Sequence, residues 1–414
     1  MHRLGRILGL LSLGMLLFAC QGRKEKRAVE TEAWKGVDLS PMGERINERN
    51  TAFAFRLFRL LAEGESSGGS FLISPFSVTS LLSMLMNGAD GDCLGEMRRA
   101  LCLDSFPLDS INDYYHRMVG MSHKDSLSEL EIGYSVWVNA DFAVKSSFRN
   151  LCYAKYDAEV FGLDFFASDA VEKVNRWCAE KTGGRIPEVV GDLSERERML
   201  LVNTLYFQGK WEYEFSKEAT RPELFAAMDG TAGEVKMMRQ TETFWLMRDS
   251  LFDIAELPYK EGRFSMVIFL PLARKDWRTC LDAFTAENWR RWEAMGKLRR
   301  LDLWLPEFQM EKRHSLKDAL RALGMVLPFE TRTDNFPRLA DGELGIGEVF
   351  QNTFISVDEG GTEAAAATVV TIIAEEELPS ELQPYPFHVN HPFLFLIKEN
   401  KSGTILFMGQ VTRI

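Results

Sequence analysis

The sequence lacks the residue patterns on which most enzyme classes depend. Its 414 residues include only six histidines, none of them in an HExxH pattern, and no GxxxxGK[ST] phosphate-binding loop occurs. The net charge of -11 provides no basic excess that would favour nucleic acid or an anionic lipid surface. We therefore expect no nucleic-acid partner, no cofactor, no metal site and no enzymatic activity.

The sequence also has few long apolar runs, and the one at the N-terminus is typical of a secretion signal. The N-terminal run Ile7–Phe18 follows two arginines and is too short to span a bilayer comfortably, a pattern that predicts a secretion signal over residues 1–19. The run ends in the residues LFAC, which resemble the lipobox of bacterial lipoproteins, so Cys20 is the expected lipidation site. A signal cleaved without lipidation is the alternative, because Phe18 is bulkier than the usual residue there.

Lipidation would anchor the protein in a bacterial cell envelope, periplasmic or surface-exposed. No aspartate directly follows Cys20, which favours the outer membrane over the inner one. Two or three acyl chains give durable anchoring, whereas one chain binds only marginally.

Cysteine beyond the lipobox is sparse and odd in number, with no CxxC pair and no metal-ligand spacing. Buried free thiols are the favoured interpretation, although up to two disulfides remain open. The five residues are Cys93, Cys102, Cys152, Cys178 and Cys280.

The rest of the chain predicts one α+β domain over residues 47–414, preceded by a polar, flexible tether over residues 20–46. No internal repeat and no linker divides the domain, and we expect a monomer. Expected helices are Asn47–Ala62, Pro75–Met86, Ala170–Lys181 and Ser315–Leu323. Expected strands are Phe71–Ile73, Ile132–Asn139, Met199–Phe207, Phe264–Leu270, Leu301–Trp304, Phe393–Ile397 and Thr404–Met408.

A GxSxG pattern at Gly64–Gly68 raises the possibility of a hydrolase with Ser66 as its nucleophile. That chemistry needs a strand before the serine and a helix after it. The expected order here is reversed, so a turn is favoured and the hydrolase is kept only as an alternative.

The segment Phe354–Ile373 carries conflicting structural preferences. Two glycines in Asp358–Gly361 free the backbone, the four alanines of Ala364–Ala367 favour helix, and Val369–Ile373 favours strand. Composition alone predicts a short surface helix followed by a strand. The same mixture also suits a segment that adopts two conformations.

This segment resembles the mobile hinge of the serpin family, whose pattern is E-x-G-T-E-A-A-A-A. The hinge residues that correspond are Glu359, Gly360, Gly361, Thr362, Glu363, Ala364, Ala365, Ala366 and Ala367. Other stretches resemble the family in the same order along the chain. They are Ser74-Pro75-x-Ser77, Asn175-x-Trp177, Leu201-Val202-Asn203 with Gly209-Lys210-Trp211, Asn390–Phe393 and Phe407–Gly409.

The resemblance implies the serpin fold, with three β-sheets, eight or nine helices and an exposed mobile reactive-centre loop. It also implies a suicide inhibitor of serine proteases, and of cysteine proteases as an extension, acting by loop cleavage and insertion. The alternative is a non-inhibitory serpin-fold binding or chaperone-like lipoprotein. Residues implied for the shutter and breach, which lie beneath the middle and top of the main sheet, are Ser74, Ser77, Asn203, Trp211 and Gln351.

Two residues depart from the family pattern. Gln351 stands where the family usually has a histidine that hydrogen-bonds with the equivalents of Ser77 and Asn203. An amide both donates and accepts, so a network is still expected. Glu307 stands where a basic residue commonly pairs with the hinge glutamate, so we expect it to repel Glu359 and ease opening of the sheet.

Insertion requires that alternate loop residues enter the protein interior, so these must be small or apolar. The inward set, counted from Thr362, contains no charge and no proline: Thr362, Ala364, Ala366, Thr368, Val370, Ile372 and Ala374. This predicts an inhibitory serpin.

Family spacing puts the reactive bond between Glu375 and Glu376, with cleavage after Ile373 or Ala374 as alternatives. No arginine or lysine lies between Thr362 and Val389. Elastase-like or glutamate-accepting proteases are therefore expected as targets ahead of trypsin-like ones.

Overall fold

The computed structural model describes residues 36–65, 69–121, 127–185, 187–193, 197–272, 276–331, 334–362 and 383–414, with the backbone of residues 123–124. Several predictions lie outside these residues. They concern Cys20, Ser66, the hinge residues Glu363–Ala367 and the reactive-bond candidates Ile373–Glu376.

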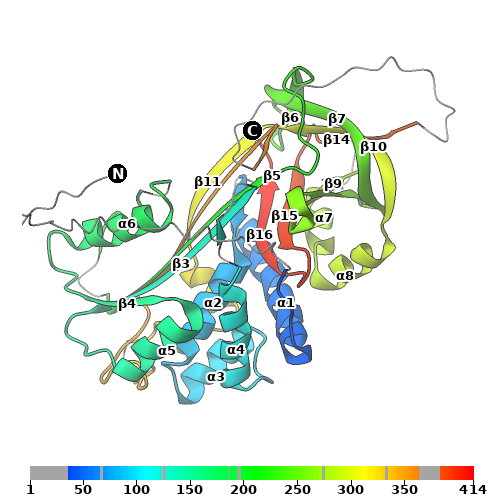
Figure 1. Cartoon of the computed structure of the whole chain (residues 1–414). Coiled ribbons are helices and arrows are strands. Elements are labelled where there is room, and N and C mark those ends of the chain that lie inside the picture. The colour runs from blue at the N-terminus through cyan, green and yellow to red at the C-terminus, as the bar shows by residue number, and fades with distance from the viewer. Residues whose placement is uncertain are drawn as a thin grey trace, which may run out of the picture. The chain divides into compact units, whose positions relative to one another are not determined.

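A seven-stranded sheet carries the strand that leads into the hinge (Figure 1). Its order is β11-β12-β13-β5-β3-β2, with β4 parallel to β3. The strands are β2 (His123–Lys124), β3 (Ser128–Asn139), β4 (Glu159–Leu163), β5 (Met199–Lys210), β11 (Phe308–Ser315), β12 (Glu348–Asp358) and β13 (Gly361–Thr362).

A nine-stranded sheet has the order β1-β16-β15-β9-β8-β7-β10-β14, with β6 beside β7. The family resemblance implied three sheets. Two of those strand groups share β7 and hydrogen-bond as one sheet, because its 17 residues pair with β6, β8 and β10 in turn. The strands are β1 (Phe71–Ile73), β6 (Arg221–Ala226), β7 (Ala232–Arg248), β8 (Phe252–Pro258), β9 (Phe264–Pro271), β10 (Lys297–Pro306), β14 (Tyr385–His388), β15 (Phe393–Glu399) and β16 (Ile405–Val411).

The described residues form nine α-helices, and the predicted α+β class is confirmed. Helix α2 is buried along all 12 residues because it contacts both β5 of one sheet and β16 of the other. Within the described residues, no helix is both long and apolar enough to cross a membrane. The helices are α1 (Pro41–Gly64), α2 (Pro75–Met86), α3 (Gly91–Ala100), α4 (Leu108–Val119), α5 (Ser146–Tyr156), α6 (Ala170–Lys181), α7 (Trp277–Ala283), α8 (Ala286–Met295) and α9 (Lys317–Ala322).

Helix α1 begins six residues earlier than predicted, so the expected tether over residues 20–46 is wrong at its C-terminal end. Ser40 is the N-cap, and its Oγ accepts a hydrogen bond from the Gly43 amide at 3.1 Å. Pro41 follows at the first helical position, where a proline is well tolerated. Ile46 is fully buried, so the domain already has core residues before Asn47.

Helix α6 contacts β3 on one face of the seven-stranded sheet (Figure 1). Asn175 of α6 fastens the segment that leads back toward the sheet. Its Oδ1 accepts from the Val189 and Val190 amides at 2.8 and 2.9 Å, and its Nδ2 donates to the Val190 carbonyl. The helix therefore covers the sheet and is tied to the loop that follows it.

All five described cysteines are free thiols, as favoured from the sequence. Burial raises the pKa of the Cys93, Cys152 and Cys178 thiols to about 12. These thiols are therefore protonated and unreactive at neutral pH.

Candidate functional site

The candidate site is the position between strands β5 and β12 at which the sheet could take in a further strand, and we call this position the slot. The two strands pair directly and in parallel from Glu348 opposite Leu200 to Thr353 opposite Leu205. Beyond this stretch the two-residue strand β13 lies between them and pairs antiparallel with both. The chain thus leaves the sheet on β12, reverses, and begins to enter it again as an additional strand.

The loop after β5 holds the reversal at the end of β12. The carbonyls of Asp358, Glu359 and Gly360 each accept a hydrogen bond from this loop. The Asp358 carbonyl accepts from Trp211 Nε1 at 3.0 Å, and the Gly360 carbonyl accepts from the Trp211 amide at 3.0 Å. The Glu359 carbonyl accepts from the Phe215 amide at 2.9 Å. The start of the hinge is therefore ordered.

Gly361 is required by close backbone contact. Its φ of 153° is rarely adopted by other residues, and a Cβ atom there would lie 2.0 Å from the Gly209 carbonyl oxygen of β5. Asp358 Oδ1 supports the tight turn by accepting the amide hydrogen bonds of Gly360 and Gly361 at 2.9 and 3.2 Å. No larger residue allows the chain to pass this closely between the two strands.

The Thr362 side chain points into the protein interior. Its side chain is fully buried, and its Oγ1 lies 2.7 Å from the hydroxyl oxygen of Tyr259. The Tyr259 ring stacks on Trp211, with ring centres 4.6 Å apart and planes at 9°. The breach residue Trp211 therefore contacts the hinge both through its backbone and through this stack. Tyr259 was not predicted as a site residue because it is far from the hinge in sequence.

The shutter residues come together beneath the middle of the slot, but with different partners from those expected. Gln351 does not bond Ser77 or Asn203. Instead, its Oε1 accepts the Ser74 amide and its Nε2 donates to the Ser74 carbonyl, both at 2.9 Å. Ser74 Oγ donates to Ser77 Oγ at 3.1 Å, and Asn203 Nδ2 donates to the Gly133 carbonyl of β3 at 3.1 Å. The glutamine is long enough to reach the backbone at the start of α2, which explains the difference.

A buried histidine does lie beside the slot, on β11 rather than β12. His314 is opposite Gln351 in the strand register, and its Nε2 donates to the Leu72 carbonyl at 3.0 Å. Thr353 Oγ1 donates to the same carbonyl at 2.9 Å. Burial lowers the pKa of His314 to about 4, so it is neutral at physiological pH. Sequence reasoning missed it because a lone strand histidine carries no recognisable pattern.

The two carboxylates expected to repel each other do lie together. The Glu359 carboxyl is within hydrogen-bonding reach of Glu307 and accepts from Thr220 Oγ1 at 2.9 Å. Lys236 of β7 donates to Glu307 at 3.0 Å, an interaction that the sequence did not indicate. Burial, and then the Glu359 charge, raise the pKa of Glu307.

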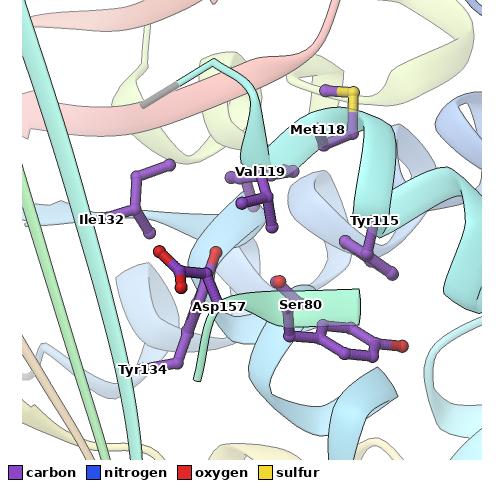
Figure 2. A pocket seen from close by; sticks show the side chains of 9 residues that line it. Ser80, Tyr115, Met118, Val119, Ile132, Tyr134 and Asp157 are labelled. Atoms are coloured by element: carbon purple, nitrogen blue, oxygen red, sulfur yellow. The ribbon is translucent and has the colours of Figure 1, made fainter. Parts of the chain in front are cut away.

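A small cavity on the α2 side of the sheet offers no room for a ligand. Figure 2 shows Ser80 of α2, Tyr115 and Met118 of α4, and Tyr134 of β3 among the side chains around it. Its volume is about 10 Å³, enough for one water molecule at most.

A family profile described as "Serpin (serine protease inhibitor)" matches residues 48–414. The chain belongs to the serpin family. It is 32% identical over 385 residues to the leukocyte elastase inhibitor of Sus scrofa, covering 89% of this chain and 99% of that protein. It is also 32% identical over 374 residues to an uncharacterized serpin-like protein of Thermococcus kodakarensis, covering 88% and 85%.

Among solved structures, the thermophilic serpin tengpin in its native state superposes with a TM-score of 0.83 at 26% identity. The alignment covers 92% of this chain and 96% of tengpin. Serpins are mostly protease inhibitors rather than enzymes, although some members are non-inhibitory. The helix-then-strand order around residues 66–68 also lacks the arrangement that the hydrolase alternative requires.

Replacing Gln351 with leucine tests its role in this serpin's shutter. The Ser74 amide would lose its buried partner, whereas the Ser74 carbonyl would still accept from Val78. We expect a loss of about 1 to 3 kcal/mol and an unfolding midpoint lowered by a few degrees at fixed heating rate. Gln309→Leu, at an exposed position of β11, is the matched control and should leave the midpoint unchanged. Equal midpoints for both variants would contradict this role.

Proposed function

We propose that this serpin is a suicide inhibitor of serine or cysteine proteases, acting by cleavage and insertion of its reactive-centre loop. The observation that carries the proposal is strand β13. Gly361 and Thr362 lie between β12 and β5 in the antiparallel direction that a fully inserted strand would have. Insertion would extend a strand that is already started.

The chemistry comes from the target protease. Its serine or cysteine attacks the carbonyl carbon of the reactive bond, the C–N bond breaks, and an ester or thioester forms. The proton from the nucleophile passes to the new amino group of the C-terminal fragment. While this acyl-enzyme persists, the hinge side of the loop inserts and carries the attached protease away from its cleavage position.

The register of β13 supports insertion of the predicted loop residues. Val357 and Gly209 flank Thr362, so each further pair of loop residues advances the strand two positions down β12 and β5. The inward loop residues would then lie beside side chains that are already buried. These are Ile355, Thr353, Gln351 and Val349 of β12, and Phe207, Leu205, Asn203 and Leu201 of β5.

The energy balance favours insertion once the loop is free. The six parallel pairs between β12 and β5 are lost, and two antiparallel ladders replace them. Antiparallel pairing is slightly more stable per residue. A dozen or more ladder hydrogen bonds at about 1 kcal/mol each give roughly 10 to 20 kcal/mol before that loss is subtracted.

For the target, we propose an elastase-like or glutamate-accepting protease. No arginine or lysine lies between Thr362 and Val389, which disfavours trypsin-like enzymes. The 32% identical relative named leukocyte elastase inhibitor supports the elastase-like choice. The reactive bond is proposed between Glu375 and Glu376, with Ile373 or Ala374 as alternative residues before the cut.

A panel of elastase-like, chymotrypsin-like, glutamyl-specific and papain-like proteases tests the function directly. The expected result is an SDS-stable complex with at least one of them, together with a released C-terminal peptide whose mass locates the bond. Cleavage by every protease without any stable complex would favour the non-inhibitory alternative.

Thr362→Arg tests insertion itself. An arginine would have to occupy a fully buried site beneath the sheet, where an unpaired charge costs several kcal/mol. We expect the variant to be cleaved as an ordinary substrate and to form no complex on SDS gels. Glu363→Arg, which strand alternation would place on the opposite face, is the control and should keep inhibiting. Complex formation by Thr362→Arg at the wild-type level would refute the insertion mechanism.

We propose further that the inhibitor is a lipoprotein anchored in the cell envelope through Cys20. Cys20→Ser should release the protein into the soluble fraction after expression in a bacterium. Mass measurement of the N-terminal peptide is the readout, with acyl chains expected on the wild type alone. An unacylated wild-type peptide beginning at any residue would contradict the anchor.

A further inference from the structure

Four side chains from separate parts of the chain meet at the outer end of the hinge. Glu359 comes from the turn between β12 and β13, and Glu307 comes from the link between β10 and β11. Lys236 comes from β7, and Thr220 precedes β6. The Glu307 amide also donates to the Lys236 carbonyl at 2.8 Å, so β7 fixes both the backbone and the side chain of Glu307. Of these four residues, Glu359 is the one that belongs to the hinge.

The charges in this cluster do not balance. The register of β11 and β12 brings the Glu307 and Glu359 carboxyl groups together, and among the described residues the ion pair of Lys236 is with Glu307. The Lys236 side chain is 73% exposed, whereas the Glu307 side chain is 22% exposed, so solvent screens the Lys236 charge more than that of the half-buried Glu307 carboxylate.

Two other cationic side chains near the hinge do not neutralise the second carboxylate of the cluster. Arg221 donates to the Thr220 carbonyl at 2.8 Å, and Lys210 is opposite Gly361 in the β5 register. Among the described residues, neither forms an ion pair with the two carboxylates. Asp358, in the same turn, bonds hinge amides instead.

We propose that Glu307 and Glu359 form a pH-sensitive latch that holds the hinge in the sheet in acid and loosens it as the pH rises. When one proton is shared, one carboxyl donates to the other across the hinge. When both are ionised, like charges meet, and Lys236 cancels only part of the repulsion. Lys236 is therefore a positioning residue that sets the pH at which the latch loosens.

The direction follows from proton binding. The pKa of Glu307 is raised first by burial and then by Glu359, while Lys236 opposes both effects. The docked hinge therefore holds this proton more tightly than a released hinge would. Docking is strongest in acid and weakens as the pH rises through that raised pKa.

The latch has a consequence for inhibition, and this part rests on the proposed function. A loosened hinge lowers the barrier to opening the top of the slot. Insertion should then compete better with hydrolysis of the acyl-enzyme at neutral and alkaline pH. Fewer inhibitor molecules should be consumed per protease inhibited than in acid.

Amide hydrogen exchange of peptides that cover residues 358–362 and 207–215 measures the latch without any protease. After correction for the intrinsic pH dependence of exchange, the wild-type hinge should exchange about two- to five-fold faster near pH 8 than near pH 5. Glu307→Gln should remove this dependence and keep the slow rate at both pH values. Lys236→Gln should shift the loosening to a higher pH, because the remaining pair holds its proton more tightly.

His314 titrates in the opposite sense, since its pKa is lowered and acid destabilises its buried neutral form. Its contribution is common to wild type and Glu307→Gln, so it cancels in the comparison. Equal pH dependence in these two proteins would overturn the latch. A latch confirmed by exchange in a protein that inhibits no protease would leave the latch standing and refute the proposed function instead.

Discussion

The direct pairing of β12 with β5 is the interaction on which the rest of the site depends. Six residue pairs, from Glu348 opposite Leu200 to Thr353 opposite Leu205, join the two strands directly. Farther along, Gly361 and Thr362 already lie between them. The sheet is therefore in a state intermediate between one that is fully closed and one that has gained a complete additional strand. Under the proposed mechanism the uncut loop keeps the sheet in this state, because cleavage would free one end of the segment that follows Thr362.

The hydrogen bonds beneath the sheet show which half of it is anchored. On the β12 side, Gln351 bonds the Ser74 backbone, and Thr353 bonds the Leu72 carbonyl. His314 of β11 bonds the same carbonyl. On the β5 side, Asn203 Nδ2 donates to the Gly133 carbonyl of β3, and among the described residues its buried Oδ1 atom has no partner. Among these polar side chains, those on the β12 side therefore bond the segment beneath the sheet, whereas Asn203 on the β5 side bonds its neighbouring strand.

Local sequence patterns predicted the elements whose form depends on nearby residues. Helices α2 and α6 begin and end where expected, because apolar content and helical spacing decide them locally. Helix α1 begins before the apolar spacing predicts, because Ser40 and Pro41 form a capping signal within a charged segment. The hinge residues were located through the family resemblance, since composition alone favoured a surface helix.

The contacts that hold the hinge could not be predicted in the same way. Tyr259 and Lys236 each lie more than a hundred residues from the hinge residue they act on, and the sheet topology brings them to it. The partners of Gln351 depend on the length of one side chain beneath the sheet. Such details follow from packing across the whole domain, which no single segment encodes.

The most direct test of the account is the thermal unfolding of the protein before and after a single cut in the reactive-centre loop. Insertion into the slot would complete two antiparallel ladders, so the cleaved form should unfold at a much higher temperature than the intact form at the same heating rate. An unchanged or lower midpoint after cleavage would show that the slot does not accept the loop, and the central claim would fall.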